Sequence, residues 1–162
     1  MIVVMGASGC GKTTIGRLLA RRLACEFLDA DDFHPAPNVA KMAAGVPLED
    51  ADRWPWLERL NTELRRREAR DRLAVLACSA LKQAYRERLA AGLARFDLVY
   101  LRADPELLRA RLAQRTHRYM PASLLESQLA TLEPPVNAIE IDAGQAPERC
   151  VEQAANAVLH TP

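Results

Sequence analysis

The stretch Gly6-Ala7-Ser8-Gly9-Cys10-Gly11-Lys12-Thr13 follows directly on the apolar run Ile2-Val3-Val4-Met5. It fits the pattern G-x-x-x-x-G-K-[ST], in which backbone N–H groups surround a phosphate group. Gly6, Gly9 and Gly11 stand where a positive φ or the close approach of a ligand would exclude a Cβ atom. The motif therefore predicts a nucleoside triphosphate site at the end of the first strand.

The residue types that complete the motif match the chemistry of such a site. Lys12 supplies a mobile positive charge for the β- and γ-phosphates, and Thr13 offers a hydroxyl to Mg²⁺. Residues 14–23 carry apolar side chains at helical spacing, which predicts a helix whose positive N-terminal end faces the anion. The residues predicted to bind the nucleotide at this loop are Gly6, Ala7, Ser8, Gly9, Cys10, Gly11, Lys12, Thr13 and Thr14.

The composition limits the remaining possibilities. With 162 residues, of which 49% are hydrophobic, the chain fits a single domain over residues 1–162. A formal net charge of +1 argues against a nucleic-acid or anionic membrane partner, and no apolar run approaches the ~18 residues of a membrane span. The four cysteines are scattered without a C-x-x-C pair. These features predict a cytoplasmic protein with reduced thiols.

Hydrophobic patterning predicts five strands that alternate with helices. Such alternation is typical of a parallel sheet with right-handed crossovers and helices on both faces, which makes a three-layer α/β fold. The last strand alternates in polarity, as an edge strand does. The expected strands lie at 2–5, from Glu26 to the acids that follow, at 73–78, at 96–101 and at 139–143. The expected helices lie at 14–23, at 38–44 and from 52 or 55 to 70, then after a Ser79 cap, after Asp104, after Pro121 and at 147–159.

An acidic cluster, Asp29, Asp31 and Asp32, closes the second predicted strand. The strand at 73–78 ends in Cys78-Ser79-Ala80 instead of the Walker B aspartate of motor ATPases, and the N-K-x-D motif of GTPases is absent. Because functional groups gather at the carboxyl ends of parallel strands, the acidic cluster should lie beside the phosphate loop. This layout, with an arginine-rich segment late in the chain, favours a small-molecule kinase.

The chain resembles the P-loop gluconokinases, relatives of shikimate kinase and the nucleoside monophosphate kinases. The resemblance covers nearly the whole chain and implies ATP-dependent phosphorylation of D-gluconate to 6-phospho-D-gluconate, with Mg²⁺, in a homodimer. It also implies a substrate-binding helical segment at about 36–70 and a small lid at about 115–123. It is carried, besides the loop, by Asp29-Ala30-Asp31-Asp32-Phe33-His34-Pro35, Asn38, Lys41-Met42, Gly45-Val46-Pro47-Leu48, Asp50, Asp52-Arg53, Pro55-Trp56-Leu57, Cys78-Ser79-Ala80-Leu81-Lys82, Tyr85-Arg86, Arg115 and His117.

The acidic side chains receive roles from this resemblance and from the chemistry of phosphoryl transfer. We expect Asp31 to orient the attacking hydroxyl and accept its proton, although Asp32 could exchange roles with it. Asp29 should lie closer to Mg²⁺ and act on it through a water molecule, because Mg²⁺ keeps most of its waters, while Thr13 offers its hydroxyl to the same ion. His34 either hydrogen-bonds the substrate or fixes the turn before the proline that follows it.

Three cations are the candidates for the acid end of gluconate. These are Arg53, Lys82 and Arg86, and we expect the last two to lie one turn apart on the helix that Ser79 caps. Trp54 and Trp56 could stack on a sugar chain, but core packing is the preferred interpretation for Trp56.

Arginines late in the chain are expected at the nucleotide. Arg115, in the expected lid, should reach the β- and γ-phosphates, and the related kinases suggest that Arg111 stacks on adenine opposite Pro147. Two alternatives remain open at this point: a kinase of another small hydroxy acid or polyol such as shikimate, and a nucleotide-binding module without turnover.

Overall fold

A computed structural model, which describes residues 1–114 and 122–160, contains a five-stranded parallel sheet in the order β2-β3-β1-β4-β5. The central strand β1 is buried along its whole length, which explains its continuous apolar run. The edge strand β5 alternates between exposed and buried residues, as predicted. The strands are β1 (Ile2–Met5), β2 (Glu26–Asp29), β3 (Ala74–Ala77), β4 (Asp97–Arg102) and β5 (Ile139–Asp142).

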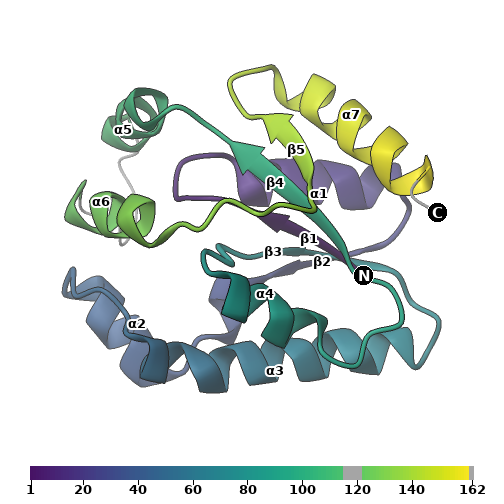
Figure 1. Ribbon diagram of the computed structural model, residues 1–162, viewed down its shortest axis with the longest axis horizontal. Coiled ribbons are helices and arrows are strands. Elements are labelled where there is room, and N and C mark those ends of the chain that lie inside the picture. Colours follow the sequence, from purple (N-terminus) through teal and green to yellow (C-terminus); the bar gives the residue numbers. More distant parts are fainter. Residues whose placement is uncertain (115–121, 161–162) are drawn as a thin grey trace.

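Helices cover both faces of the sheet (Figure 1), so the predicted three-layer α/β architecture is confirmed. Helices α1 (Lys12–Arg22) and α7 (Pro147–His160) pack on one face, where Ile2 and Val4 of β1 contribute to the core. Helices α3 (Asp50–Glu68) and α4 (Gln83–Ala90) pack on the other face. Successive residues of β1 thus supply two separate cores, because side chains of a strand alternate between its faces.

The remaining helical segments gather at the carboxyl end of the sheet (Figure 1). They are the 3-10 turn η1 (Ala30–Phe33) and the helices α2 (Ala36–Ala43), α5 (Pro105–Ala113) and α6 (Ala122–Thr131). Together they surround the edge at which functional groups of a parallel sheet are expected.

A local sequence signal sets the start of α5. The Asp104 carboxylate accepts a hydrogen bond of 2.7 Å from the N–H of Glu106, so the predicted start of α5 is confirmed.

The predicted helix cap at Ser79 is wrong. Ala80 has a φ of +44°, which no helix accommodates, and α4 begins only at Gln83, with Lys82 as its N-cap.

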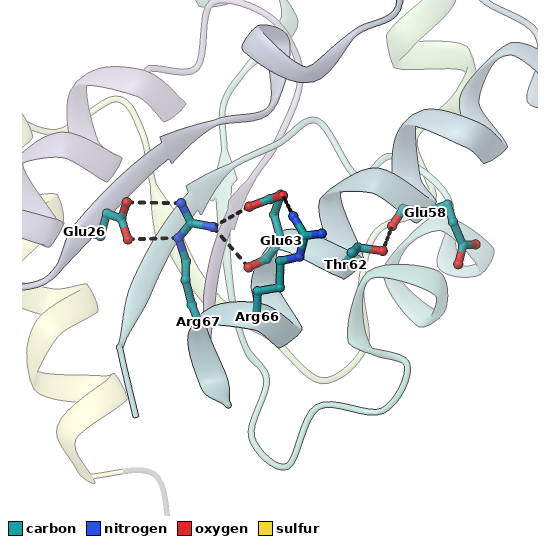
Figure 2. Close-up of polar contacts among 6 residues, drawn as sticks. All are labelled: Glu26, Glu58, Thr62, Glu63, Arg66 and Arg67. Carbon is teal, nitrogen blue, oxygen red and sulfur yellow. Dashed lines mark hydrogen bonds and ion pairs between the residues drawn. The ribbon is translucent and has the colours of Figure 1, made fainter. Parts of the chain in front are cut away.

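An arginine fixes the C-terminal end of α3 to the sheet (Figure 2). Arg67 Nε lies 2.9 Å from a carboxylate oxygen of Glu26 on β2, and its Nη1 lies 2.8 Å from Glu63 one turn earlier in α3. Hydrogen bonds from Arg67 are the main cause of the lowered pKa values of Glu26 and Glu63. Arg66 also reaches Glu63 but remains largely exposed.

The composition led to expectations about the cysteines and about membrane-spanning helices. The cysteines are free thiols, and burial raises the pKa of Cys78 to about 12. Within residues 1–114 and 122–160, no helix combines the length and the apolar character needed to cross a membrane.

Candidate active site

A cleft of about 650 Å³ opens at the carboxyl end of the sheet. The phosphate loop, residues 6–13, forms one wall, and η1, α2 and the start of α3 form another. Lys12 and all three residues of the acidic cluster line this single cleft. The expected position of the acidic cluster beside the loop is confirmed, while the chemical role of each carboxylate stays a prediction.

The phosphate loop has the backbone geometry that its glycines predict. Gly6, Gly9 and Gly11 have φ values of +144°, +89° and +100°. A Cβ atom at Gly6 would lie only 2.8 Å from the carbonyl oxygen of Leu101, so the loop could not pack there with any other residue. Gly11 caps α1 without a side-chain hydrogen bond, which leaves the positive helix end to an anion.

The polar side chains of the loop connect it to the end of β2. Thr13 Oγ1 donates a hydrogen bond of 2.9 Å to Asp29 Oδ2, and the other Asp29 oxygen accepts from the N–H of Asp31. Lys12 Nζ donates to the Ala7 carbonyl oxygen at 3.1 Å, a single neutral partner that a phosphate can replace. The predicted metal-binding pair, Thr13 and Asp29, is therefore adjacent.

These oxygens fit a magnesium ion that is bound mainly by phosphates and water. A hydroxyl and a carboxylate are the hard oxygen ligands that Mg²⁺ prefers, and Mg²⁺ commonly uses only one or two protein ligands. Across the described part of the chain, no group of three or more His, Cys, Asp or Glu side chains is placed to hold a metal. A bound ion would need the phosphates of the nucleotide to complete its coordination.

Asp31 lies in the cleft in an environment that disfavours its charge. Its side chain is 86% accessible, but the accessible surface faces the cleft, where surrounding protein atoms reduce its hydration. This desolvation, and next the charge of Asp29, raise the pKa of Asp31, whereas Lys12 opposes the shift. A carboxylate with a raised pKa is a better proton acceptor than an ordinary aspartate.

His34 is held between the cleft and the core. Its ring stacks on Trp56 at a centroid distance of 4.2 Å, and Trp56 is buried and donates to the Ala30 carbonyl oxygen, so the core interpretation of Trp56 is confirmed. Burial, and next the charge of Arg53, lower the pKa of His34 to about 4. The neutral ring therefore forms no ion pair with Asp31 at neutral pH, although their atoms approach to 3.9 Å.

Of the three cations expected at the substrate, Arg53 is the one that lines the cleft. Its Nε donates to the Leu48 carbonyl oxygen at 3.3 Å, and its guanidinium lies 5.6 Å from the centre of the Tyr85 ring. These contacts orient the guanidinium and leave most of its N–H groups for an anion. Arg53 is therefore well placed for a carboxylate in the cleft.

Lys82 forms an ion pair with Asp50 outside the cleft. Its Nζ lies 2.7 Å and 2.9 Å from the two carboxylate oxygens of Asp50, which also accepts from the Tyr85 hydroxyl. Lys82 does not line the cleft, so it would have to leave Asp50 in order to bind substrate.

The structure contradicts the expected position of Arg86. Only 4% of this residue is exposed, and its guanidinium donates to the carbonyl oxygens of Ala80 and Leu81 and to the side chain of Gln83. The late start of α4 is the physical cause, because it leaves these carbonyls outside the helix, where they need a donor. Arg86 stabilises the loop before α4 and does not face the cleft.

The residues expected around adenine, Arg111 and Pro147, do not line the cleft. Arg111 donates to the Ala143 carbonyl oxygen at 2.8 Å and lies 3.5 Å from that of Gly9, so it bridges the phosphate loop and the turn after β5. Pro147 begins α7 and is exposed. A stacking site for adenine between them stays a prediction. Arg115, His117 and most of the expected lid lie outside the described residues.

One polar residue of the site carried no recognisable signal in the sequence. Gln128 Oε1 on α6 accepts a hydrogen bond of 2.8 Å from the backbone N–H of Ser8, and Gln128 lines the cleft. The sequence predicts a helix there, but a single glutamine on a helix does not indicate contact with a loop 120 residues away.

Comparisons with known proteins agree with this arrangement. A family model described as an AAA domain matches residues 1–135. The chain is 48% identical over 134 residues to a gluconokinase of Gluconobacter oxydans (strain 621H), covering 83% of this chain and 75% of that protein. It is 40% identical over 161 residues to the thermosensitive gluconokinase of Escherichia coli (strain K12), covering 97% and 86%. The crystal structure of a gluconokinase from Sinorhizobium meliloti 1021 superposes with a TM-score of 0.87 at 38% identity, covering 98% and 90%.

Proposed function

Because the chain belongs to the gluconokinase family of P-loop kinases, we propose that it transfers the terminal phosphoryl group of ATP to a hydroxyl of D-gluconate. The product is 6-phospho-D-gluconate. The observation that supports this proposal most strongly is the shared cleft, in which Lys12 of the phosphate loop and Asp31 of the acidic cluster face the same space. A protein that only bound nucleotide would need no carboxylate at that position.

On the phosphate side, the protein supplies positive charge. The N–H groups of the loop and the open end of α1 receive the β-phosphate, and Lys12 exchanges the Ala7 carbonyl oxygen for phosphate oxygens. Because the backbone donors are fixed before the nucleotide arrives, they stabilise the developing charge with little rearrangement, and only Lys12 changes its partner.

On the acceptor side, Asp31 positions the attacking hydroxyl. The hydroxyl oxygen forms a bond to the γ-phosphorus, the bond from that phosphorus to the oxygen bridging to the β-phosphate breaks, and ADP leaves. Asp31 takes the hydroxyl proton, for which its raised pKa suits it. Asp32 lines the same cleft and is the alternative acceptor.

Thr13 and Asp29 are the residues that would hold Mg²⁺, Asp29 through water. When bound, the ion neutralises charge on the phosphate oxygens of ATP. The hydrogen bond between the two side chains keeps both oxygens together at the loop.

Recognition of gluconate needs a cation for its carboxylate and neutral polar groups for its hydroxyls. Arg53 provides the cation that lines the cleft, and Lys82 would contribute only after release from Asp50. The Nδ1 atom of the neutral His34 ring faces Asn38 Nδ2 at 3.4 Å and accepts from it, so the ring offers its Nε2–H as a donor to a hydroxyl group. The contribution of Arg115 to the phosphates, the homodimer and the cytoplasmic location stay predictions.

A coupled assay of ADP release across a panel of acceptors tests the proposal. We expect turnover with D-gluconate to exceed turnover with shikimate, other sugar acids and nucleoside monophosphates. Preference for another hydroxy acid would assign the chain to a different acceptor. Nucleotide binding without product for any acceptor would support a non-catalytic module.

A further inference from the structure

Helix α6 reaches the phosphate loop through one side chain. The Ser8 N–H donates a hydrogen bond of 2.8 Å to Gln128 Oε1. Gln128 lies on the cleft wall together with Leu124 and Ser127 of the same helix. The loop that receives the phosphates is therefore in direct contact with a residue from the C-terminal half of the chain.

The position of Gln128 is fixed by several independent contacts of α6. Leu125 is 1% exposed and belongs to the core beneath α1 and α7. Glu126 pairs with Arg109 of α5 at 2.8 Å. After the helix, the N–H of Glu133 donates to the Leu81 carbonyl oxygen, and its carboxylate accepts from the N–H of Gln83. These contacts hold α6 from both sides, so Gln128 does not meet the loop by chance.

The hydrogen bond from Ser8 fixes the orientation of the Gln128 carboxamide. Only its oxygen can accept a hydrogen bond from the Ser8 N–H, so that contact assigns the oxygen to the loop and leaves the NH₂ group with two donors. Among the described residues, no protein acceptor is found for that NH₂ group, and Gln128 lines the cleft. The ligand chemistry that matches two donors beside a phosphate loop is an anionic phosphoryl oxygen.

We propose that Gln128 is a phosphate-binding residue of this site, in which its carbonyl fixes the Ser8 peptide and its NH₂ group donates to the phosphate chain of the nucleotide. This inference rests on the proposed function for the identity of the nucleotide. It is tested by binding alone, so that failure to phosphorylate gluconate would leave the test of Gln128 intact.

Two substitutions separate the two halves of the carboxamide. Gln128→Glu keeps an acceptor for the Ser8 N–H but replaces the NH₂ group with a negatively charged oxygen. Gln128→Met keeps the length of the side chain and removes both functions. Gln153→Glu is the matched control, because it makes the same charge change on α7, at a residue that does not line the cleft.

The measurement is the dissociation constant of ADP and of a nonhydrolysable ATP analogue, by titration calorimetry with Mg²⁺, for variants whose melting temperature shows that they are folded. We expect Gln128→Met to weaken binding of the analogue at least about 10-fold and Gln128→Glu to weaken it further, with Gln153→Glu close to the unsubstituted protein.

Two results would overturn the proposal. If Gln128→Glu binds as the unsubstituted protein does while Gln128→Met is weakened, Gln128 only anchors the loop. If Gln128→Met binds normally, the glutamine donates nothing to the nucleotide, whatever the charge in Gln128→Glu does.

Discussion

The phosphate side and the acceptor side of the cleft are built in different ways. The phosphate side comes from one continuous stretch, residues 6–13, whose glycines and helix start determine its geometry locally. The acceptor side is assembled from several elements, the consecutive η1, α2 and start of α3 together with the end of β3. The cation on the phosphate side, Lys12, can be identified from the motif alone. Whether a cation on the acceptor side is available to a substrate depends on which protein groups already bind it.

Arg53 and Arg86 illustrate this dependence. Both follow from the same family resemblance, and both were expected at the carboxylate of the substrate. Arg53 lines the cleft, while Arg86 is buried against the carbonyl oxygens of Ala80 and Leu81. Arg53 donates only its Nε–H to a backbone carbonyl, that of Leu48, whereas Nε, Nη1 and Nη2 of Arg86 are all bound to protein groups. An arginine in the expected segment is therefore available to a substrate only if nearby protein acceptors leave its terminal N–H groups unused.

The largest expected effect tests the carboxylate on the acceptor side. Asp31→Asn should lower kcat about 1,000-fold, because the amide cannot accept the hydroxyl proton. In the unsubstituted enzyme, kcat/KM should fall as the pH drops through the raised pKa of Asp31, above the 3.8 of an ordinary aspartate. A pH profile of the coupled assay measures both effects. If Asp32→Asn is the more damaging variant, the roles of the two residues are exchanged.

The next effect tests the phosphate side. Lys12→Ala should lower kcat at least about 100-fold without loss of the fold, since the lysine charge acts on the transferring phosphoryl group. Steady-state kinetics and the melting temperature measure the two quantities. Lys41→Ala, which removes an ion pair with Asp52 outside the loop, is the matched control and should retain near-normal turnover. Near-normal turnover of Lys12→Ala would refute the assignment of Lys12.

The variants Arg53→Ala and Arg86→Met test whether the two arginines differ in their access to the substrate. Arg53→Ala should raise the KM for gluconate roughly 30-fold with little change in stability, because a charge-assisted contact to substrate is lost. Arg86→Met should leave that KM nearly unchanged but lower the free energy of unfolding by about 1–3 kcal/mol, because buried carbonyls lose their donor. Kinetics and denaturant unfolding of both variants measure this difference. A stable Arg86→Met protein with a raised KM would show that Arg86 does reach the substrate.

The smallest effect concerns the Arg67 contacts of α3 (Figure 2), which lie away from the cleft. Arg67→Met should lower the free energy of unfolding by about 1 kcal/mol or less, and by more than Arg66→Met, because the Arg67 side chain is only 17% exposed and that of Arg66 is 66% exposed. Urea unfolding as a function of pH measures both variants.

The pH dependence of that effect has a definite sign. Folding lowers the pKa values of Glu26 and Glu63, so their contribution is fully present above the unfolded value of about 4.5 and is lost as the pH falls through the lower folded values. The difference between Arg67→Met and the unsubstituted protein should therefore shrink in acid. A difference that is independent of pH would indicate lost packing of the side chain instead.

Residues whose role follows from a local pattern were predictable from the sequence. The loop glycines, the Asp104 cap, the buried strands and the place of the acidic cluster all follow from spacing and periodicity. The start of α4 was not predictable in this way, because the positive φ of Ala80 has no marker such as glycine. The contact of Gln128 with Ser8 depends on how α6 packs at the carboxyl end of the sheet, which no local pattern encodes.

The central claim is that Asp31 and the phosphate loop serve one acceptor hydroxyl in one cleft. A crystal structure with a nonhydrolysable ATP analogue, Mg²⁺ and D-gluconate tests it most directly. We expect a gluconate hydroxyl within about 3.2 Å of the Asp31 carboxylate and facing the terminal phosphoryl group held at Lys12. Gluconate bound with its hydroxyls out of reach of Asp31 and Asp32, or at a site that does not adjoin the phosphate loop, would contradict the account.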